Sequence, residues 1–210
     1  MKGNHMKTIK EPITNTIIIE KSKFICSIKR VKSEQEATEF IGKIKKEHWS
    51  ANHNCSAFII GKHSEIMRSS DNGEPSGTAG APMLDSLKKN NLSDIVAVVT
   101  RYFGGIKLGA GGLIRAYSKS VSEAIKQATI IESILMNEVL IKVSYPVANI
   151  IDNKTSNYLC FKKDYSEEVC FTFYVKPSEQ DKFIHLITEL TNAHFTSQIL
   201  RQINYDLEIN

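Results

Sequence analysis

The sequence has no long apolar run and no paired-cysteine motif, and these absences exclude several classes of protein. No apolar segment approaches the roughly 18–20 residues that span a bilayer, and the first residues lack the apolar core of a secretion signal. The four cysteines (Cys26, Cys55, Cys160 and Cys170) show no C-x-x-C spacing, and three lie in strand-like apolar segments, where a buried free thiol is the default. We therefore expect a reduced, cytoplasmic protein with no membrane partner.

Length and residue pattern predict an α+β protein of two domains. The 210 residues, 41% of them hydrophobic, suffice for two small cores. Residues 137–209 show the order β-α-β-β-α-β of the ferredoxin-like split motif. We place the domains at 1–134 and 135–210, with no glycine- or proline-rich linker between them. Met6 is the expected initiator, so residues 1–5 are expected to be an addition to the natural chain.

The charge is unevenly divided along the chain. The net charge is +4, but residues 1–136 contain 20 Lys and Arg against 13 Asp and Glu, which gives +7. Residues 137–210 contain 7 against 10, which gives −3. The basic first part favours a polyanion as its partner, although a lysine-rich solvated helix face gives the same count.

Glycines gather in one part of the chain. Eight of the 11 lie between Gly73 and Gly112, in loops that flank the β-branched segment Asp94–Thr100, which is typical of a buried strand. Glycine costs entropy when ordered and serves where the backbone turns with positive φ or approaches a partner closely. We therefore expect the first glycine loop (residues 71–82) and the second (residues 101–115) to form one binding surface of backbone amides.

The second glycine loop is expected to open a helix at Leu113–Thr129, in which Leu113, Tyr117 and Val121 lie on one apolar face at helical spacing. Free amides at a helix N-terminus and the helix dipole attract phosphate or carboxylate, although a tight strand-to-helix connection needs similar glycines. Arg115, in the first helical turn, would add countercharge. The loop matches neither the Walker pattern nor the dinucleotide pattern G-x-G-x-x-G. The predicted anion- or nucleic-acid-binding residues are Arg101, Tyr102, Gly104, Gly105, Lys107, Gly109, Gly111, Gly112 and Arg115.

The first glycine loop carries two carboxylates three residues apart, Asp71 and Glu74. Such a pair suits Mg²⁺ binding or acid–base chemistry, but Asp and Ser side chains also fix turns through nearby backbone amides. We favour turn scaffolding, and a further structural reading pairs Glu74 or Asp71 with Arg101. The predicted loop-shaping residues are Asp71, Glu74, Gly77, Thr78 and Gly80.

Two other side-chain pairs leave alternatives open. His53 and Cys55 share one face of a strand, as a nucleophile pair or half a zinc site would, but no orienting third group is evident. We therefore expect no metal site and no catalytic residue. Tyr102 and Phe103 would stack bases if exposed and would cap the core if buried.

Three segments resemble the YigZ/IMPACT family, also called UPF0029. They are A51-N-H-N-C55, S70-D-N-G-E-P-S-G-T-A-G-A-P82 and V98-V-T-R-Y-F-G-G-I-K-L-G-A-G-G-L-I-R-A-Y117. Long strings punctuated by glycine are a specific signal, and the resemblance covers about residues 10–205. The family pattern reads S-D-D-G-E-P, whereas Asn72 replaces the second aspartate here, which argues against a metal-binding carboxylate pair.

The resemblance implies particular domain folds and a role connected with RNA or the ribosome. It implies an N-terminal domain like ribosomal protein S5 domain 2, and a C-terminal ferredoxin-like domain similar to the last domain of elongation factor G. Both are pieces that act on RNA or the ribosome. The eukaryotic relative regulates translation by competing for the activator of an initiation-factor kinase, with the help of an additional domain, so we expect that particular partnership not to transfer.

We therefore expect a non-catalytic regulator of translation or stress that uses no cofactor. Its basic glycine loops would bind RNA, the ribosome, or a nucleotide or phosphate, and the acidic C-terminal domain would contact a protein. The alternative is a hydrolase of peptidase or phosphate-transfer type, acting on a small anionic substrate at the same loops. Fold analogy alone does not decide between them.

Overall fold

The computed structural model describes residues 6–209, so the expected addition at residues 1–5 lies outside the described part. Within it, the chain has a mixed α/β fold with two β-sheets and five α-helices, which confirms the mixed class expected from the sequence. The chain divides into two compact units. The first contains the described residues up to Ser133 together with residues 207–209, and the second contains Ile134–Asp206. Among the described helices, none is long and apolar enough to cross a membrane.

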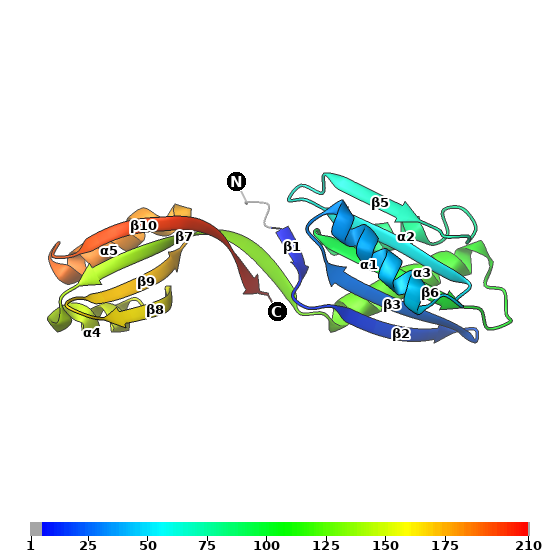
Figure 1. Ribbon diagram of the computed structural model, residues 1–210, viewed down its shortest axis with the longest axis horizontal. Coiled ribbons are helices and arrows are strands. Elements are labelled where there is room, and N and C mark those ends of the chain that lie inside the picture. The colour runs from blue at the N-terminus through cyan, green and yellow to red at the C-terminus, as the bar shows by residue number, and fades with distance from the viewer. Residues whose placement is uncertain (1–5, 210) are drawn as a thin grey trace. The chain divides into compact units, whose positions relative to one another are not determined.

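The first unit is built on an antiparallel sheet in the order β2–β3–β6–β4–β5 (Figure 1). Its strands are β2 (Ile13–Ile19), β3 (Ser22–Arg30), β4 (His53–Ile60), β5 (Ile66–Ser70) and β6 (Ile95–Tyr102). The central strand β6 is buried from Ile95 to Arg101 because helices cover both faces of the sheet. Cross-strand pairing aligns Arg101 with Phe24 and His53. As a result, the end of β6 and the starts of β3 and β4 lie at one edge.

Three helices cover this sheet (Figure 1). They are α1 (Glu34–Glu47) on one face, and α2 (Gly80–Lys89) and α3 (Gly109–Gln127) on the other. The larger core lies under α2 and α3, where Phe24, Met83 and Tyr117 are fully buried. The smaller core lies under α1, which begins where the Ser33 hydroxyl accepts a hydrogen bond from the Glu36 amide.

The helix α3 begins four residues earlier than the sequence predicts. Glycine disfavours a helix by about 1 kcal/mol relative to alanine, so the run from Gly109 to Gly112 suggests a loop. In the structure these residues form the first turn, and a Cβ added to Gly112 would lie 3.0 Å from the Cβ of Leu108. Glycine is therefore used here for close approach, and Arg115 lies in the second turn, which corrects its predicted place in the first.

The second unit has the element order expected from the sequence. Its elements are β7 (Ile130–Val143), α4 (Tyr145–Lys154), β8 (Leu159–Tyr165), β9 (Val169–Val175), a 3₁₀ turn (Pro177–Glu179), α5 (Gln180–Thr191) and β10 (Thr196–Glu208). Its strands lie in the order β10–β7–β9–β8. Both helices pack on one face, where Ile151 of α4 and Phe183 of α5 share a core with Ile141, Phe171 and Phe173.

Segments near the two ends of the described chain meet in the first unit. The strand β1 (Met6–Ile9), which the sequence did not reveal, pairs antiparallel with Ile130–Ser133 at the start of β7. The amide of Ile209 donates to the carbonyl of Ile130 at 3.0 Å, and Lys10 forms an ion pair with Glu208. The first unit is thus completed by residues from the far end of the sequence.

Candidate functional site

The two glycine loops meet at the sheet edge where β6 ends, and they enclose a pocket of about 370 Å³. This volume lies within the range of about 300–1,000 Å³ that is typical of small-molecule sites. One wall is polar and is formed by His53, Glu74 and Arg101. The apolar part of the lining is formed by Phe103, which packs against the Arg101 guanidinium, and by Leu108 and Leu113 of the α3 region. Segments that are remote in the sequence thus build one concave site.

Asp71 organises the first glycine loop. Its carboxylate accepts hydrogen bonds from the amides of Gly77 (2.8 Å), Ala79 (3.0 Å) and Gly80 (2.8 Å). Burial alone would raise the pKa of this carboxyl, but the three amide donors lower it below its ordinary value. The hydroxyl of Thr78 donates to the carbonyl of Pro75. Asp71 therefore stabilises the loop and the start of α2, and its side chain does not converge with that of Glu74.

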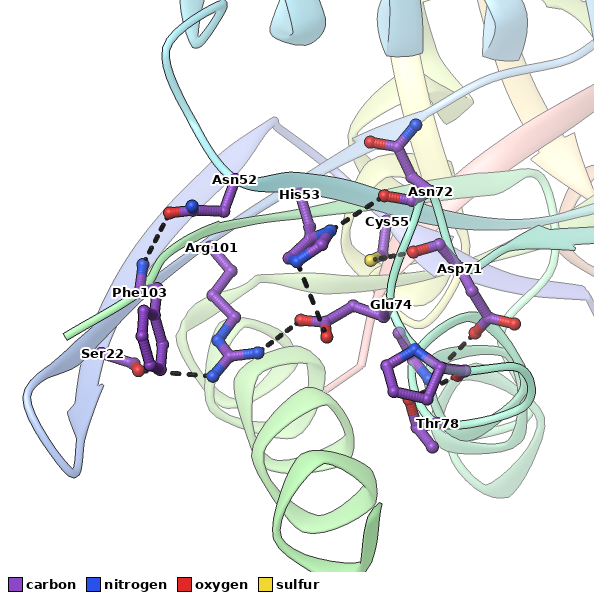
Figure 2. Close-up of polar contacts among 12 residues, drawn as sticks. Ser22, Asn52, His53, Cys55, Asp71, Asn72, Glu74, Thr78, Arg101 and Phe103 are labelled. Atoms are coloured by element: carbon purple, nitrogen blue, oxygen red, sulfur yellow. Dashed lines mark hydrogen bonds and ion pairs between the residues drawn. The ribbon is translucent and has the colours of Figure 1, made fainter. Parts of the chain in front are cut away.

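Glu74 is a buried anion at the centre of the site. One carboxylate oxygen, Oε1, accepts from Nη1 of Arg101 and from the hydroxyl of Tyr117, each at 2.7 Å. The other, Oε2, lies 3.8 Å from Nε2 of His53. Figure 2 shows the carboxylate between His53 and Arg101. Of the two carboxylates that the sequence offered as partners for Arg101, Glu74 is the one that pairs.

The expectation that Arg101 presents a free positive charge to solvent is corrected by the structure. The residue is only 5% exposed, and its guanidinium lies over the rings of Phe24 and Phe103 at 5.4 and 5.5 Å. Its charge is compensated by Glu74. The reason is its register: Arg101 lies on the face of β6 that α3 covers, beside Phe24.

His53 is oriented by the backbone of the first glycine loop. Its Nδ1 lies 3.0 Å from the carbonyl oxygen of Asn72, and because a carbonyl only accepts, Nδ1 must carry the proton of this bond. The other nitrogen, Nε2, therefore faces Glu74 at the pocket wall. The side-chain oxygen of Asn72 also accepts from the amide of Asn54 at 2.8 Å, which ties the loop to β4.

Cys55 lies behind this wall as a neutral thiol. Its S–H donates to the carbonyl of Asp71 at 2.9 Å, and the hydroxyl of Tyr117 lies 3.4 Å from the sulfur. Burial raises the pKa of Cys55 to about 12, and burial likewise raises the pKa of Tyr117. Since the thiolate is the nucleophile, Cys55 is unsuited to be the nucleophile of a Cys–His pair.

The residues after β6 divide between packing and exposure. Gly104 packs: a Cβ there would lie 2.0 Å from the carbonyl carbon of Lys21, and its amide already donates to the hydroxyl of Ser22. The predicted role of Gly104 as a free amide donor is therefore corrected. Tyr102 is half-buried and its hydroxyl contacts Nδ1 of His48 at 3.0 Å. Phe103 is 44% exposed and, of the two aromatics, offers the more open ring.

Of the remaining predicted contacts, Lys107 and Gly109 line the pocket, whereas Gly105, Gly111, Gly112 and Arg115 are not among its lining residues. Lys107, at its wall, and Arg115 in α3 have exposed side chains. Gly105 and Gly109 adopt positive φ values of 88° and 68°, which L-residues with side chains rarely adopt. No side chain caps the first turn of α3, whose N-cap residue is Leu108.

Sequence reasoning missed several residues that complete the site. Tyr117 was expected only on an apolar helix face, but its hydroxyl contacts Glu74. The side-chain oxygen of Asn52 accepts from the amide of Phe103 at 2.8 Å. Ser22 lies 3.5 Å from Nη2 of Arg101. Asn52 and Tyr117 lie within the segments that carry the family resemblance, but only the tertiary fold shows that they and Ser22 reach the two loops.

Fold and site thus define a mixed α/β protein of two units, whose glycine loops enclose a pocket around a buried Glu–Arg pair. The Impact N-terminal domain model matches residues 20–125. The IMPACT family member YvyE of Bacillus subtilis (strain 168) is 54% identical over 188 residues, which cover 89% of this chain and 87% of that protein. The chain belongs to the IMPACT family.

Other similarities extend over different parts of the chain. The IMPACT family member YigZ of Escherichia coli (strain K12) is 38% identical over 136 residues, covering 64% of this chain and 67% of that protein. A solved crystal structure described as that of a hypothetical protein has a TM-score of 0.61 and 28% identity. It covers 94% of this chain and 98% of its own, so the likeness extends over both units.

Proposed function

We propose that this protein regulates translation by binding RNA at the mouth of the pocket. The observation that carries the proposal is the position of Lys107 and Arg115, two exposed cations beside a helix N-terminus that no side chain caps. Such a terminus attracts phosphate through its amides and its dipole. Family membership supports the translational role, since the eukaryotic relative regulates translation.

Electrostatics of the surrounding surface also support an RNA ligand. The carboxylate of Glu74 is compensated by Arg101, so it does not offset the charge of Lys107 and Arg115. Residues 1–136 carry a net charge of +7, which attracts a polyanion over distances of about 10 Å at moderate salt. Gly105, Gly109 and Gly111, near these cations in the sequence, are exposed residues with no side chain to cover their backbone.

The proposal assigns different roles to two domains, at residues 1–134 and 135–210. The first, which we consider similar to ribosomal protein S5 domain 2, binds RNA or the ribosome. The second, with its ferredoxin-like order of elements and net charge of −3, contacts a protein partner. The four cysteines are free, which supports a reducing, cytoplasmic setting.

Salt-dependent RNA binding tests this function. A fluorescent single-stranded RNA of about 20 nucleotides is titrated at several salt concentrations, because each neutralised phosphate steepens the salt dependence by roughly 0.7 in log–log slope. We expect Lys107→Ala combined with Arg115→Ala to weaken binding about 10-fold or more and to flatten this slope.

The matched control removes two positive charges at the far end of α2. Lys88→Ala with Lys89→Ala changes the net charge equally, in the last turn of that helix, and should leave most of the affinity intact. Equal losses in both double variants would reduce the binding to non-specific attraction and contradict the proposal. Turnover of a nucleotide or peptide by the wild-type protein would favour the hydrolase instead.

A further inference from the structure

The pocket itself is not accounted for by phosphate contacts at its mouth. Its interior combines an apolar wall with a small number of polar groups, as ligand sites do. Phe103 is 44% exposed and lines the pocket. A flat aromatic partner could stack on its ring. An aliphatic or fully polar ligand would leave either the ring or the polar wall unused.

A buried cation in the wall has unused hydrogen-bonding capacity. A guanidinium carries five N–H donors, whereas Arg101 makes one short bond to Glu74 at 2.7 Å and one long contact to Ser22 at 3.5 Å. Its Nε–H is buried and finds no acceptor among the described residues. Buried polar groups are rarely left in this condition. Because Arg101 also lines the pocket, we expect its remaining donor capacity to favour a polar, electron-rich ligand.

Two further side chains at the wall can recognise a polar ring edge. The side-chain oxygen of Asn52 is engaged by the amide of Phe103, which leaves the NH₂ group of Asn52 to donate. The Nδ1–H of His53 is bonded to the carbonyl of Asn72, and its Nε2 lies 3.8 Å from Oε2 of Glu74, beyond hydrogen-bond distance. Both residues line the pocket together with Phe103, and polar side chains beside an aromatic ring are the groups that read the edge of a nucleobase.

From these contacts we infer that the pocket binds one nucleoside phosphate unit. The base stacks on Phe103 with its edge towards Asn52 and His53, and the phosphate lies at the first turn of α3 beside Lys107. The unit comes either from a free nucleotide or from an unpaired residue of an RNA strand, since both present the same chemistry. The inference concerns the same loops as the proposed RNA-binding function, and rests on that function where the source is RNA.

The test compares small ligands with RNA on the full chain. Adenosine, guanosine, cytidine and uridine monophosphates, the parent nucleosides and ribose 5-phosphate are titrated by calorimetry, together with the 20-nucleotide RNA. We expect at least one monophosphate to bind at least about 10-fold more tightly than both its nucleoside and ribose 5-phosphate, because each of those lacks one of the two contacts. If that monophosphate displaces the RNA, the pocket also accepts a nucleoside phosphate unit that belongs to an RNA strand.

Two variants separate the base contact from the phosphate contact. Phe103→Leu keeps an apolar side chain but removes the stacking ring. It should weaken binding of the monophosphate about 10-fold. Ala110→Asp places a negative charge in the first turn of α3, where the helix dipole favours it for folding but where it repels phosphate. This variant should remove the gain in affinity that the phosphate gives, and it should leave binding of the parent nucleoside unchanged. Gln35→Glu, which adds the same charge to the first turn of α1, is the control.

The outcomes distinguish the pocket from the proposed function. Failure of every monophosphate to bind at millimolar concentration overturns the inference. Binding of RNA that is unchanged by Phe103→Leu and Ala110→Asp, and not displaced by monophosphates, also overturns it while leaving the proposed function intact. Binding of a monophosphate with the expected variant profile, in a protein that does not bind RNA, supports the pocket and removes the proposed function.

Discussion

At the scale of single residues, the site depends on a charge pair that is largely shielded from water. Glu74 and Arg101 have side chains only 3% and 6% exposed and are joined at 2.7 Å. Desolvation makes such pairs costly to form, and the loss of one partner leaves the other charge buried and uncompensated. Tyr117 adds a second hydrogen bond to the same carboxylate oxygen. The pair therefore shapes the pocket wall more than it offers charge to a ligand.

Removing one member of this pair should destabilise the fold severely. We expect Glu74→Ala to lower the free energy of unfolding by about 3–5 kcal/mol, because it strands the Arg101 guanidinium. Urea denaturation followed by far-UV circular dichroism measures this. Glu74→Leu combined with Arg101→Met should cost less than the sum of the two single changes.

An exposed ion pair supplies the comparison. Glu123 and Lys126 are joined at 2.8 Å on the surface of α3, where a pair contributes at most about 1 kcal/mol. Glu123→Ala should therefore change stability little. A loss of less than about 1 kcal/mol for Glu74→Ala would show that the buried pair is not the structural centre of the site.

At the scale of elements, the first glycine loop acts as the N-terminal cap of α2. No side chain at the N-cap position, Ala79, performs this role, and the carboxylate of Asp71 performs it from eight residues before, through amides that include Gly80. The same residue holds the S–H of Cys55 through its carbonyl. One aspartate thus fixes a loop, a helix start and a strand relative to one another.

This cap makes part of the stability depend on pH. The folded pKa of Asp71 is lowered, so its contribution is fully present above the unfolded value of about 3.9 and is lost as pH falls through the folded pKa. We expect Asp71→Asn to lower the free energy of unfolding by about 1–3 kcal/mol at pH 7. The difference from wild type should shrink below about pH 4, as measured by urea denaturation from pH 3 to 7.

An aspartate within the helix α2 itself serves as the control. Asp85 is exposed on α2, and Asp85→Asn removes the same charge without removing the cap. Its effect should be small at every pH in the series. If the difference in unfolding free energy between wild type and Asp71→Asn stayed constant down to pH 3, the charge-based account of the cap would be contradicted.

The sequence predicted elements well where side-chain periodicity dominates, and less well where glycine does. Leu113, Tyr117 and Val121 marked α3 correctly because their spacing follows the helical period. Its first turn was missed because the low helix propensity of Gly111 and Gly112 is overridden by packing that a local window does not contain. β1 was missed because it pairs with residues more than 120 positions away.

The two glycine loops meet as the sequence predicted, but the charge of Arg101 does not lie where the sequence placed it. The motif strings around Glu74 and Arg101 do line one pocket, as the two-loop interpretation required. Whether Arg101 faces solvent depends on the register of β6 against β3 and β4, which a one-residue shift would reverse. Residue type and spacing do not specify that register, so the buried pair could be named only as one alternative.

At the scale of the whole molecule, the chain crosses between its two units twice. β7 starts in the first unit and continues into the second, and β10 starts in the second and ends in the first. The amide of Ile209 and the side chain of Glu208 then bond Ile130 and Lys10. Residues 207–209 therefore contribute to the unit that contains the candidate site.

Removing the end of the chain should weaken the first unit more than the second. We expect a chain that ends at Asp206 to lose hydrogen-exchange protection in β1 and in residues 130–133, because the bond from Ile209 to Ile130 and the Lys10–Glu208 pair are gone. Hydrogen exchange with mass spectrometry, with β9 as the internal reference, measures the change. Equal protection of β1 in both chains would show that the last residues are dispensable.

Because β10 ends in the first unit, part of that unit can form only late in the synthesis of the polypeptide. Domains usually fold in order as they leave the ribosome, at about 5–20 residues per second. Here the contacts of Lys10 and Ile130 with Glu208 and Ile209 form only once a segment more than 70 positions after Ser133 has been made, which is roughly 4–15 s later at those rates. Maturation of the pocket-bearing unit is therefore expected to coincide with the end of synthesis of this segment, and not with the emergence of its own sheet.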